Sequence, residues 1–185
     1  MRASVLAAQA HLADLLLPGY RRQPHVTLAL CGFPTQAPRH PDDFGPADLD
    51  AQLAALQALD HEPFELEIGP LASFSSAPFL AVHDPQGGIA RLRHALVAAS
   101  RQAGQAGGPY TPHVTVGLYA GSWPTADIQR RLDDFPSVPA LRCRIEGISL
   151  MHYAAPEIGG PLSTLADFHL AARRLSWRQG PPPDL

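Results

Sequence analysis

The segment Pro-His-Val-Thr followed by an aliphatic residue occurs twice in this chain, as PHVTL at 24–28 and as PHVTV at 112–116. Each copy follows an apolar pattern of helical spacing, and a second helical pattern and two strand-like runs come after it. The first unit has a helix over 3–17, strand 24–31, helix 46–59 and strands 63–71 and 78–83; the second has helix 88–104, strand 112–119, helix 124–134 and strands 139–152 and 163–174. The repeat predicts a duplicated fold with two pseudo-symmetric halves, about 1–83 and 84–178.

Two such units related by a pseudo-two-fold axis bring the motif strands side by side, facing one cleft. The chain has 185 residues, 45% of them hydrophobic, which suffices for one compact domain. Its apolar runs are interrupted before the ~20 residues that a membrane-spanning helix needs. We therefore expect a cytoplasmic monomer without membrane attachment. Cys31 and Cys143 lie in strand-like runs and are expected to be small buried thiols, and the Pro-rich tail 179–185 is expected to be disordered.

Charge and basic-residue usage exclude several classes of function. The net charge is −3, so any anion site has to be local rather than a property of the whole surface. All fourteen basic residues are arginine, and no lysine is present. This excludes covalent nucleotidyl-lysine chemistry, Schiff bases and the phosphate-binding loop that ends in Gly-Lys-Ser/Thr. A ligase that adenylates its own lysine with ATP is excluded with them.

The two motifs carry the residue types of acid–base chemistry on phosphate esters. Side chains alternate faces along a strand, so His25 and Thr27 share one face, as do His113 and Thr115, ~6.5–7 Å apart along the strand. Imidazoles titrate near pH 6.5, so one ring can act as the general acid and the other as the general base. Threonine hydroxyls can donate to phosphoryl oxygens, and this chemistry requires no metal.

PHVTL and PHVTV resemble the paired His-x-Thr-x motifs of the two-histidine phosphoesterase superfamily. Within it, the chain is most similar to 2'-5' RNA ligase or RNA 2',3'-cyclic phosphodiesterase proteins. The resemblance implies a bilobal α+β fold, with an antiparallel sheet in each lobe, helices outside and a central cleft. It also implies hydrolysis of 2',3'-cyclic phosphates on RNA ends or nucleotides to 2'-phosphates, with reversible 2'-5' joining as a second activity. Neither a cofactor, a metal nor ATP is implied.

By this resemblance, His25 is the general acid that protonates the leaving 3'-oxygen, and His113 activates water. Thr27 and Thr115 are expected to hold the phosphoryl oxygens. The chain departs from the family pattern at Leu118, where many such phosphodiesterases have an arginine two residues past the second motif. A strand that the repeat predicts before 3–17 is also missing.

Five further residues are candidates for substrate binding. Tyr20 and Arg22 lead into the first motif, although a solvated turn is an equal alternative. Phe33 and Tyr119 lie just past the motifs and are candidates to stack on a base, with ordinary packing as the alternative. His152 ends a long strand and is placed to reach the cleft mouth. The remaining histidines lack a paired context and are interpreted as surface or hydrogen-bonded interior residues: His11, His40, His61, His83, His94 and His169.

Two other functions are compatible with the motifs. The chain can be a nucleotide- or RNA-binding module that keeps the four-residue arrangement without turnover, and turnover of a 2',3'-cyclic nucleotide distinguishes this from an enzyme. Alternatively, His25 and His113 can be metal ligands. Neither motif supplies a carboxylate or third imidazole at ligand spacing, and activity in the presence of a chelator tests this alternative.

Overall fold

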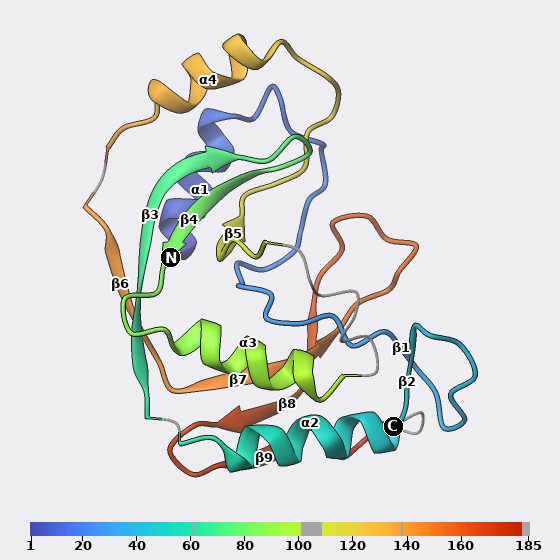
Figure 1. The fold of residues 1–185 in the computed structure, drawn as a ribbon. Helices are drawn as coiled ribbons and strands as arrows, with labels where there is room; N and C mark the ends of the chain where they lie inside the picture. The colour runs from blue at the N-terminus through green and yellow to red at the C-terminus, as the bar shows by residue number, and fades with distance from the viewer. Residues whose placement is uncertain (61, 101–108, 138, 183–185) are drawn as a thin grey trace.

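The computed structural model describes residues 1–60, 62–100, 109–137 and 139–182 (Figure 1). The predicted helical residues 101–104, His61 and the end of the Pro-rich tail at 183–185 lie outside the described part. The described residues form four helices and nine strands: α1 Arg2–His11, β1 Phe33–Pro34, β2 Asp43–Phe44, α2 Pro46–Ala58, β3 Phe64–Ser73, β4 Pro78–His83, α3 Gly88–Ala98, β5 His113–Thr115, α4 Thr125–Asp133, β6 Leu141–Ile145, β7 Gly147–His152, β8 Ser163–His169 and β9 Arg174–Trp177.

A four-stranded antiparallel sheet in the order β5-β4-β3-β6 forms the centre of the molecule. The alternating sequence of β3 explains its place there: Phe64, Leu66 and Ile68 are buried, while the glutamates between them point to the other face. The apolar side of α1 joins the same core through Val5 and Ala8. Figure 1 shows α1 and α4 at the upper end of this sheet.

A second antiparallel sheet in the order β7-β8-β9 lies at the lower end, beside α2 and α3 (Figure 1). The predicted strand 163–174 is wrong as one element, because the chain turns back after His169 and β9 pairs with β8. The predicted strand 139–152 also divides. Its first part, β6, pairs with β3, whereas its second part, β7, pairs with β8. The chain changes sheet at Gly147, where a Cβ atom would stand 2.7 Å from the carbonyl oxygen of Phe168.

The sheets do not follow the two sequence halves. The central sheet takes β3 and β4 from the first half and β5 and β6 from the second, so the second motif lies on a strand paired with β4 of the first half. The division into halves at about 83 stays a prediction. Mixed helices and antiparallel sheets confirm the α+β class.

The first motif does not form the predicted strand over 24–31, because none of the strand ladders among the described residues includes it. Side chains from elsewhere satisfy its carbonyl groups instead. Tyr110 donates its hydroxyl hydrogen to the carbonyl oxygen of Thr27 at 2.8 Å, and Arg93 of α3 donates to that of Leu28 at 2.6 Å. Val26, Leu28 and Ala29 still pack against the core, which explains the strand-like apolar pattern.

The N-terminal helix ends at His11 rather than at residue 17. Beyond it the chain runs beside the segment that follows β5, with Leu17 N donating to Leu118 O at 2.7 Å and Ala120 N to Leu15 O at 2.9 Å. These backbone bonds replace the helical ones that the periodicity predicts. Two other helices form close to their predicted bounds, since α2 covers 46–58 and α4 covers 125–133. Helix α3 begins at Gly88 as predicted but ends at Ala98, so the predicted helix 88–104 is too long.

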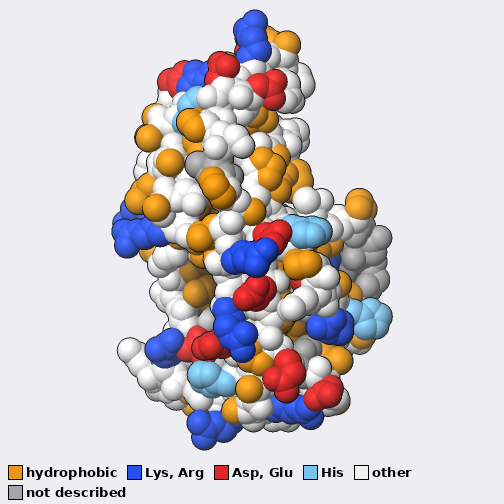
Figure 2. Space-filling model, turned by 90° about the vertical axis from the view of Figure 1, so that its left-hand side faces the viewer, with side chains coloured by type: hydrophobic (Ala, Val, Ile, Leu, Met, Phe, Trp, Pro, Cys, Tyr) orange, Lys and Arg blue, Asp and Glu red, His pale blue; other side chains and the backbone are white. Residues whose placement is uncertain are grey.

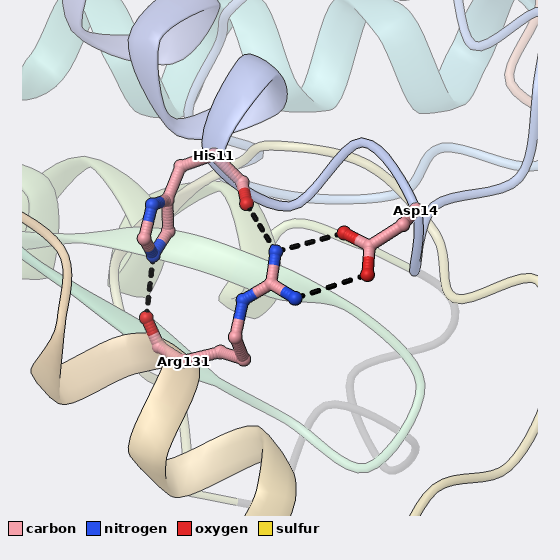
Figure 3. A network of polar contacts seen from close by, with 3 residues as sticks. All are labelled: His11, Asp14 and Arg131. Atoms are coloured by element: carbon pink, nitrogen blue, oxygen red, sulfur yellow. Dashed lines mark hydrogen bonds and ion pairs between the residues drawn. The ribbon is translucent and has the colours of Figure 1, made fainter.

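Helix α4 is fastened to the end of α1 by the three residues in Figure 3. The guanidinium group of Arg131 donates to both carboxylate oxygens of Asp14, at 2.8 and 2.9 Å, and to the carbonyl oxygen of His11. His11 in turn donates Nε2–H to the carbonyl oxygen of Arg131 at 2.6 Å. The hydrogen bond from Arg131 lowers the pKa of Asp14. His11 is therefore a hydrogen-bonded histidine, as expected.

Edge strand β6 carries arginines that face glutamates on β3. Arg142 lies opposite Glu67 and forms an ion pair with it, and Arg144 lies opposite Glu65. Figure 2, which shows this side of the molecule, has positive and negative side chains intermixed over its lower half. Charged side chains protect an edge strand from pairing with another chain. None of the helices formed by the described residues is both long and apolar enough to cross a membrane.

The start of α3 generates a prediction about stability. Asp84 caps this helix, accepting hydrogen bonds from Gly88 N at 2.8 Å and Ala90 N at 3.2 Å. A Cβ at Gly88 would stand 2.4 Å from Cγ and Cδ2 of the buried Phe64 ring. Gly→Ala in a helix normally stabilises by ~1 kcal/mol, but we expect Gly88→Ala to reduce the free energy of unfolding by ~1–3 kcal/mol through overpacking.

Chemical denaturation measures this change. The same substitution in a Phe64→Leu background is the matched control, because the shorter side chain leaves room for the added methyl group. An increase in stability for Gly88→Ala in the unmodified chain would contradict the close contact with Phe64.

Candidate active site

The imidazole rings of His25 and His113 are oriented by the same hydrogen bond. In each ring Nδ1 lies 2.7 Å from the carbonyl oxygen two residues earlier, Gln23 for the first motif and Thr111 for the second. A carbonyl oxygen can only accept, so Nδ1 carries the hydrogen in both rings. The neutral ring then presents Nε2 with its lone pair, and the protonated ring presents Nε2–H. Both motifs thus expose the same nitrogen for chemistry.

Strand β5 fixes the second motif. Val114 and Val116 are fully buried on its core side, whereas His113 and Thr115 are half-buried on the opposite side. The predicted sharing of one face by His113 and Thr115 is therefore confirmed by the alternation of β5.

Two phenylalanines pack against the His113 ring. Phe74 meets it edge-on at 4.9 Å between ring centroids with an interplanar angle of 83°, and Phe79 lies at 5.4 Å and 63°. The phenyl rings stack on each other at 4.2 Å. Phe74 lies in the β3–β4 hairpin, whose closing bond runs from Phe74 N to Ala77 O at 2.9 Å. Sequence reasoning missed both residues, although the stretch PLASFSSAPF near the end of the first half was the available signal.

Tyr110 and Arg93 connect the first motif with the second. Tyr110 lies three residues before His113, yet its hydroxyl group bonds to the backbone of Thr27. The guanidinium group of Arg93 stacks over the Tyr110 ring, 4.2 Å from its centroid. Thr27 itself is exposed, so its hydroxyl group is accessible. Sequence reasoning missed these two contacts, and the only signal was the position of Tyr110 just before a motif.

The two histidines are electrostatically coupled. The pKa of His25 lies below its ordinary value of 6.5, first because burial disfavours the charged ring and then because of the positive charges of Arg22 and His113. The hydrogen bond with Gln23 acts in the opposite direction. A proton on His113 therefore opposes a second proton on His25. The charge of His113 is thus part of the electrostatic environment of His25.

Arg22 and Tyr20 lie beside the first motif, as predicted. Arg22 donates from Nε to the carbonyl oxygen of Gly160 at 3.1 Å and lies over the Tyr153 ring, 4.4 Å from its centroid. Tyr20 packs against Gly159, and burial raises the pKa of its phenol. These residues contact the loop between β7 and β8, so the interpretation as a freely solvated turn is wrong.

The positions of the other three substrate-binding candidates give little support for a role in binding. Tyr119 is half-buried, with its hydroxyl group 2.7 Å from Ser73 Oγ and its ring 5.8 Å from that of Trp123. These contacts favour the packing role. Phe33 lies in β1 with 57% of its surface exposed, and His152 is the exposed last residue of β7. No contact that the structure describes joins either of them to a motif histidine.

Two surface hollows lie away from the motifs. One is lined by residues around the β8–β9 turn, including His169 and Arg174, and the other lies between α4 and Leu15. In the described part of the chain, no three His, Cys, Asp or Glu side chains are grouped as ligands of a metal ion would be.

Comparison with known proteins identifies the family and the fold of the chain. The family model described as the 2'-5' RNA ligase superfamily matches residues 5–157. No curated protein matches the chain. Among solved structures, TT0787 of Thermus thermophilus is similar with a TM-score of 0.63 and 20% identity, over 91% of each chain. LigT of E. coli, solved in complex with 3'-AMP, is similar with a TM-score of 0.54 and 15% identity, also over 91% of each chain.

The two structural similarities show that the fold is shared, and the family match extends over most of the sequence, including both motifs. The family predicted from the paired His-x-Thr-x motifs is thereby confirmed. The chain belongs to the 2'-5' RNA ligase superfamily.

Proposed function

We propose that this protein hydrolyses 2',3'-cyclic phosphates at RNA ends or on nucleotides to 2'-phosphates, without metal or ATP, and that 2'-5' joining uses the same site with a 5'-hydroxyl group in place of water. One observation carries the proposal: the two motif imidazoles are held by the same hydrogen bond at Nδ1, which leaves Nε2 of each ring for proton transfer. An acid and a base of this kind serve the two proton transfers of phosphoester hydrolysis. The complex of the structurally similar LigT with 3'-AMP supports a nucleotide ligand.

The reaction assigns one proton transfer to each histidine. His113 Nε2 accepts a proton from a water molecule as the water oxygen bonds to phosphorus. The bond between phosphorus and the 3'-oxygen breaks, and His25 Nε2–H gives its proton to that oxygen. The 2'-phosphate remains. His25 ends neutral and His113 protonated, and exchange with solvent restores the starting state.

The general acid has to be protonated, and the environment of His25 makes its protonation depend on bound substrate. In the free protein, burial and the nearby positive charges favour the neutral ring. A bound phosphate brings negative charge, which favours protonation of a neighbouring imidazole. The proton that the acid needs is thus stabilised when substrate binds. Thr27 and Thr115 complete the proposal as donors to the phosphoryl oxygens, whose negative charge grows in the transition state.

Replacing either histidine tests the proton transfers. We expect His25→Ala and His113→Ala each to lower kcat for 2',3'-cyclic nucleotides by ~10²–10⁴-fold, and the double variant to lose little more. His83→Ala, at the exposed end of β4, is the matched control. Chromatography of the products identifies the isomer, and parallel assays contain excess chelator and no ATP. Nucleotide binding without turnover would show that the chain is the non-catalytic module. Activity that requires a divalent ion would contradict the proposed metal-independent chemistry.

The pKa of His25 gives a second test. NMR titration should show His25 titrating below 6.5 in the free protein, because burial and the charges of Arg22 and His113 lower its pKa. His113→Asn removes one of those charges and should raise the pKa of His25, as should saturation with a nucleoside 2'-phosphate. An unchanged titration in both experiments would show that His25 does not face His113 and the phosphate.

The same shift affects stability in a defined pH range. Between 6.5 and the lowered pKa of folded His25, the unfolded chain binds a proton that the folded chain does not. We therefore expect the contribution of this group to be present above pH 6.5 and to be lost as the pH falls through the folded pKa. Comparing urea midpoints of the unmodified chain and His25→Asn across this range isolates the contribution.

Threonine substitutions test the oxyanion contacts. Thr27→Val and Thr115→Val keep the side-chain shape but remove a donor, so we expect kcat to fall ~10–10³-fold while the product remains the 2'-phosphate. Thr125→Val, on the exposed first turn of α4, is the control. Full activity in both motif variants, or equal amounts of 2'- and 3'-phosphate from the unmodified protein, would be incompatible with an in-line arrangement of the four residues.

A further inference from the structure

Residues 20–23, which lead into the first motif, form one unit with the loop between β7 and β8. Arg21 N donates to Gly159 O at 2.8 Å. The side-chain amide of Gln23 pairs in both directions with the backbone of Leu162, at 3.0 and 2.7 Å. Gly159 has a φ of +69°, and a Cβ there would stand 2.7 Å from the Tyr20 ring. The close approach is thus built on a residue that only glycine fills without strain.

Arg22 is the cation that this unit holds in place. Its Nε–H donates to Gly160 O, and its guanidinium plane lies over Tyr153, so two contacts fix the group. Within the described part of the chain, neither contact uses the two terminal nitrogens. Its neighbour Arg21 differs, because Arg21 forms an ion pair with Glu157. Arg22 is therefore an oriented guanidinium group with its fork of N–H donors available and no carboxylate contact in the described residues.

The charge of Arg22 acts within the site. It is one of the charges that lower the pKa of His25. Along the chain, however, Arg22 lies three residues before His25, whereas Thr27 lies two residues after it. The contacts of Arg22 are with the loop between β7 and β8, whereas the backbone of Thr27 is bonded to Tyr110. The reacting phosphate is assigned to the side of Thr27, so an anion at Arg22 is a different one.

We propose that Arg22, held by Tyr153 and the carbonyl group of Gly160, binds the phosphodiester that links the reacting nucleotide to the preceding one. This inference rests on the proposed function and specifies its substrate as the end of an oligonucleotide. A guanidinium group donates two parallel hydrogen bonds to the two non-bridging oxygens of a phosphodiester. A 2',3'-cyclic mononucleotide lacks this phosphate, so Arg22 affects it only through the pKa of His25 and not through binding.

Three substrates and two variants test the proposal. The substrates are a trinucleotide ending in a 2',3'-cyclic phosphate, the same trinucleotide with an uncharged methylphosphonate at the linkage nearest that end, and a 2',3'-cyclic mononucleotide. The variants are Arg22→Gln and the matched control Arg21→Gln, which removes only an exposed ion pair. KM and kcat are measured for each combination.

We expect Arg22→Gln to raise KM for the trinucleotide ~10–100-fold, as loss of a charge-assisted pair does, with kcat within about threefold. The mononucleotide should change by less than about threefold, and so should Arg21→Gln with every substrate. For the unmodified protein, KM for the methylphosphonate trinucleotide should exceed KM for the phosphodiester trinucleotide by the same factor. For Arg22→Gln, the two trinucleotides should have the same KM. Equal losses for mononucleotide and trinucleotide, or no loss for either, would overturn the proposal.

A binding measurement separates this inference from the proposed reaction. The dissociation constant of a 5'-fluorescein trinucleotide with a terminal 2'-phosphate is measured by anisotropy. If the protein shows no turnover but Arg22→Gln weakens this binding and the methylphosphonate abolishes the difference, the proposed function fails and the phosphate site stands. If turnover occurs but binding is independent of Arg22, the phosphate site fails and the proposed function stands.

Discussion

A proline between acceptor and donor determines how each motif histidine is presented. In Gln23-Pro24-His25 and Thr111-Pro112-His113 the ring bonds to the carbonyl group on the far side of the proline. The proline ring fixes its own φ and restricts the residue before it to extended conformations, so the carbonyl group has little freedom to turn away. The recurring proline is thus explained by ring orientation, and the proposed proton transfers depend on that orientation because it leaves Nε2 as the reactive atom in both rings.

The two motifs reach the same site by different structural means. The second lies on β5, where a ladder with β4 and two buried valines hold the histidine face outward. The first pairs with no strand in the part of the chain that the structure describes, and it is held by side-chain donors from α3 and from Tyr110, together with apolar contacts to the core. Just before the first motif, the loop after β7 places Tyr153 and Gly160 in contact with Arg22.

The sequence predicted the repeated motifs, the family, the α+β class, and the approximate bounds of α2, β3, β4 and α4. The periodicity of a sequence indicates which face of a segment is buried. It predicted the buried face of β5 correctly, because a strand buries alternate residues. Periodicity does not indicate which groups form hydrogen bonds with the backbone of that segment. For that reason 24–31 was predicted as a strand although its carbonyl groups bond to Arg93 and Tyr110, and 139–152 was predicted as one strand although Gly147 lets it change sheets. Phe74 and Phe79 were missed for the same reason, since their contact with His113 is a tertiary one.

The hydroxyl group of Tyr110 has a consequence for how the two halves of the site stay in register. Tyr110 belongs to the strand approach of one motif and bonds to the main chain of the other, with Arg93 stacked on its ring and bonded to the next carbonyl group along. One phenol therefore acts as a spacer between the motifs, and a slip of one segment past the other by a single residue would break its bond. The spacing between the two motifs therefore depends in part on the length of a tyrosine side chain.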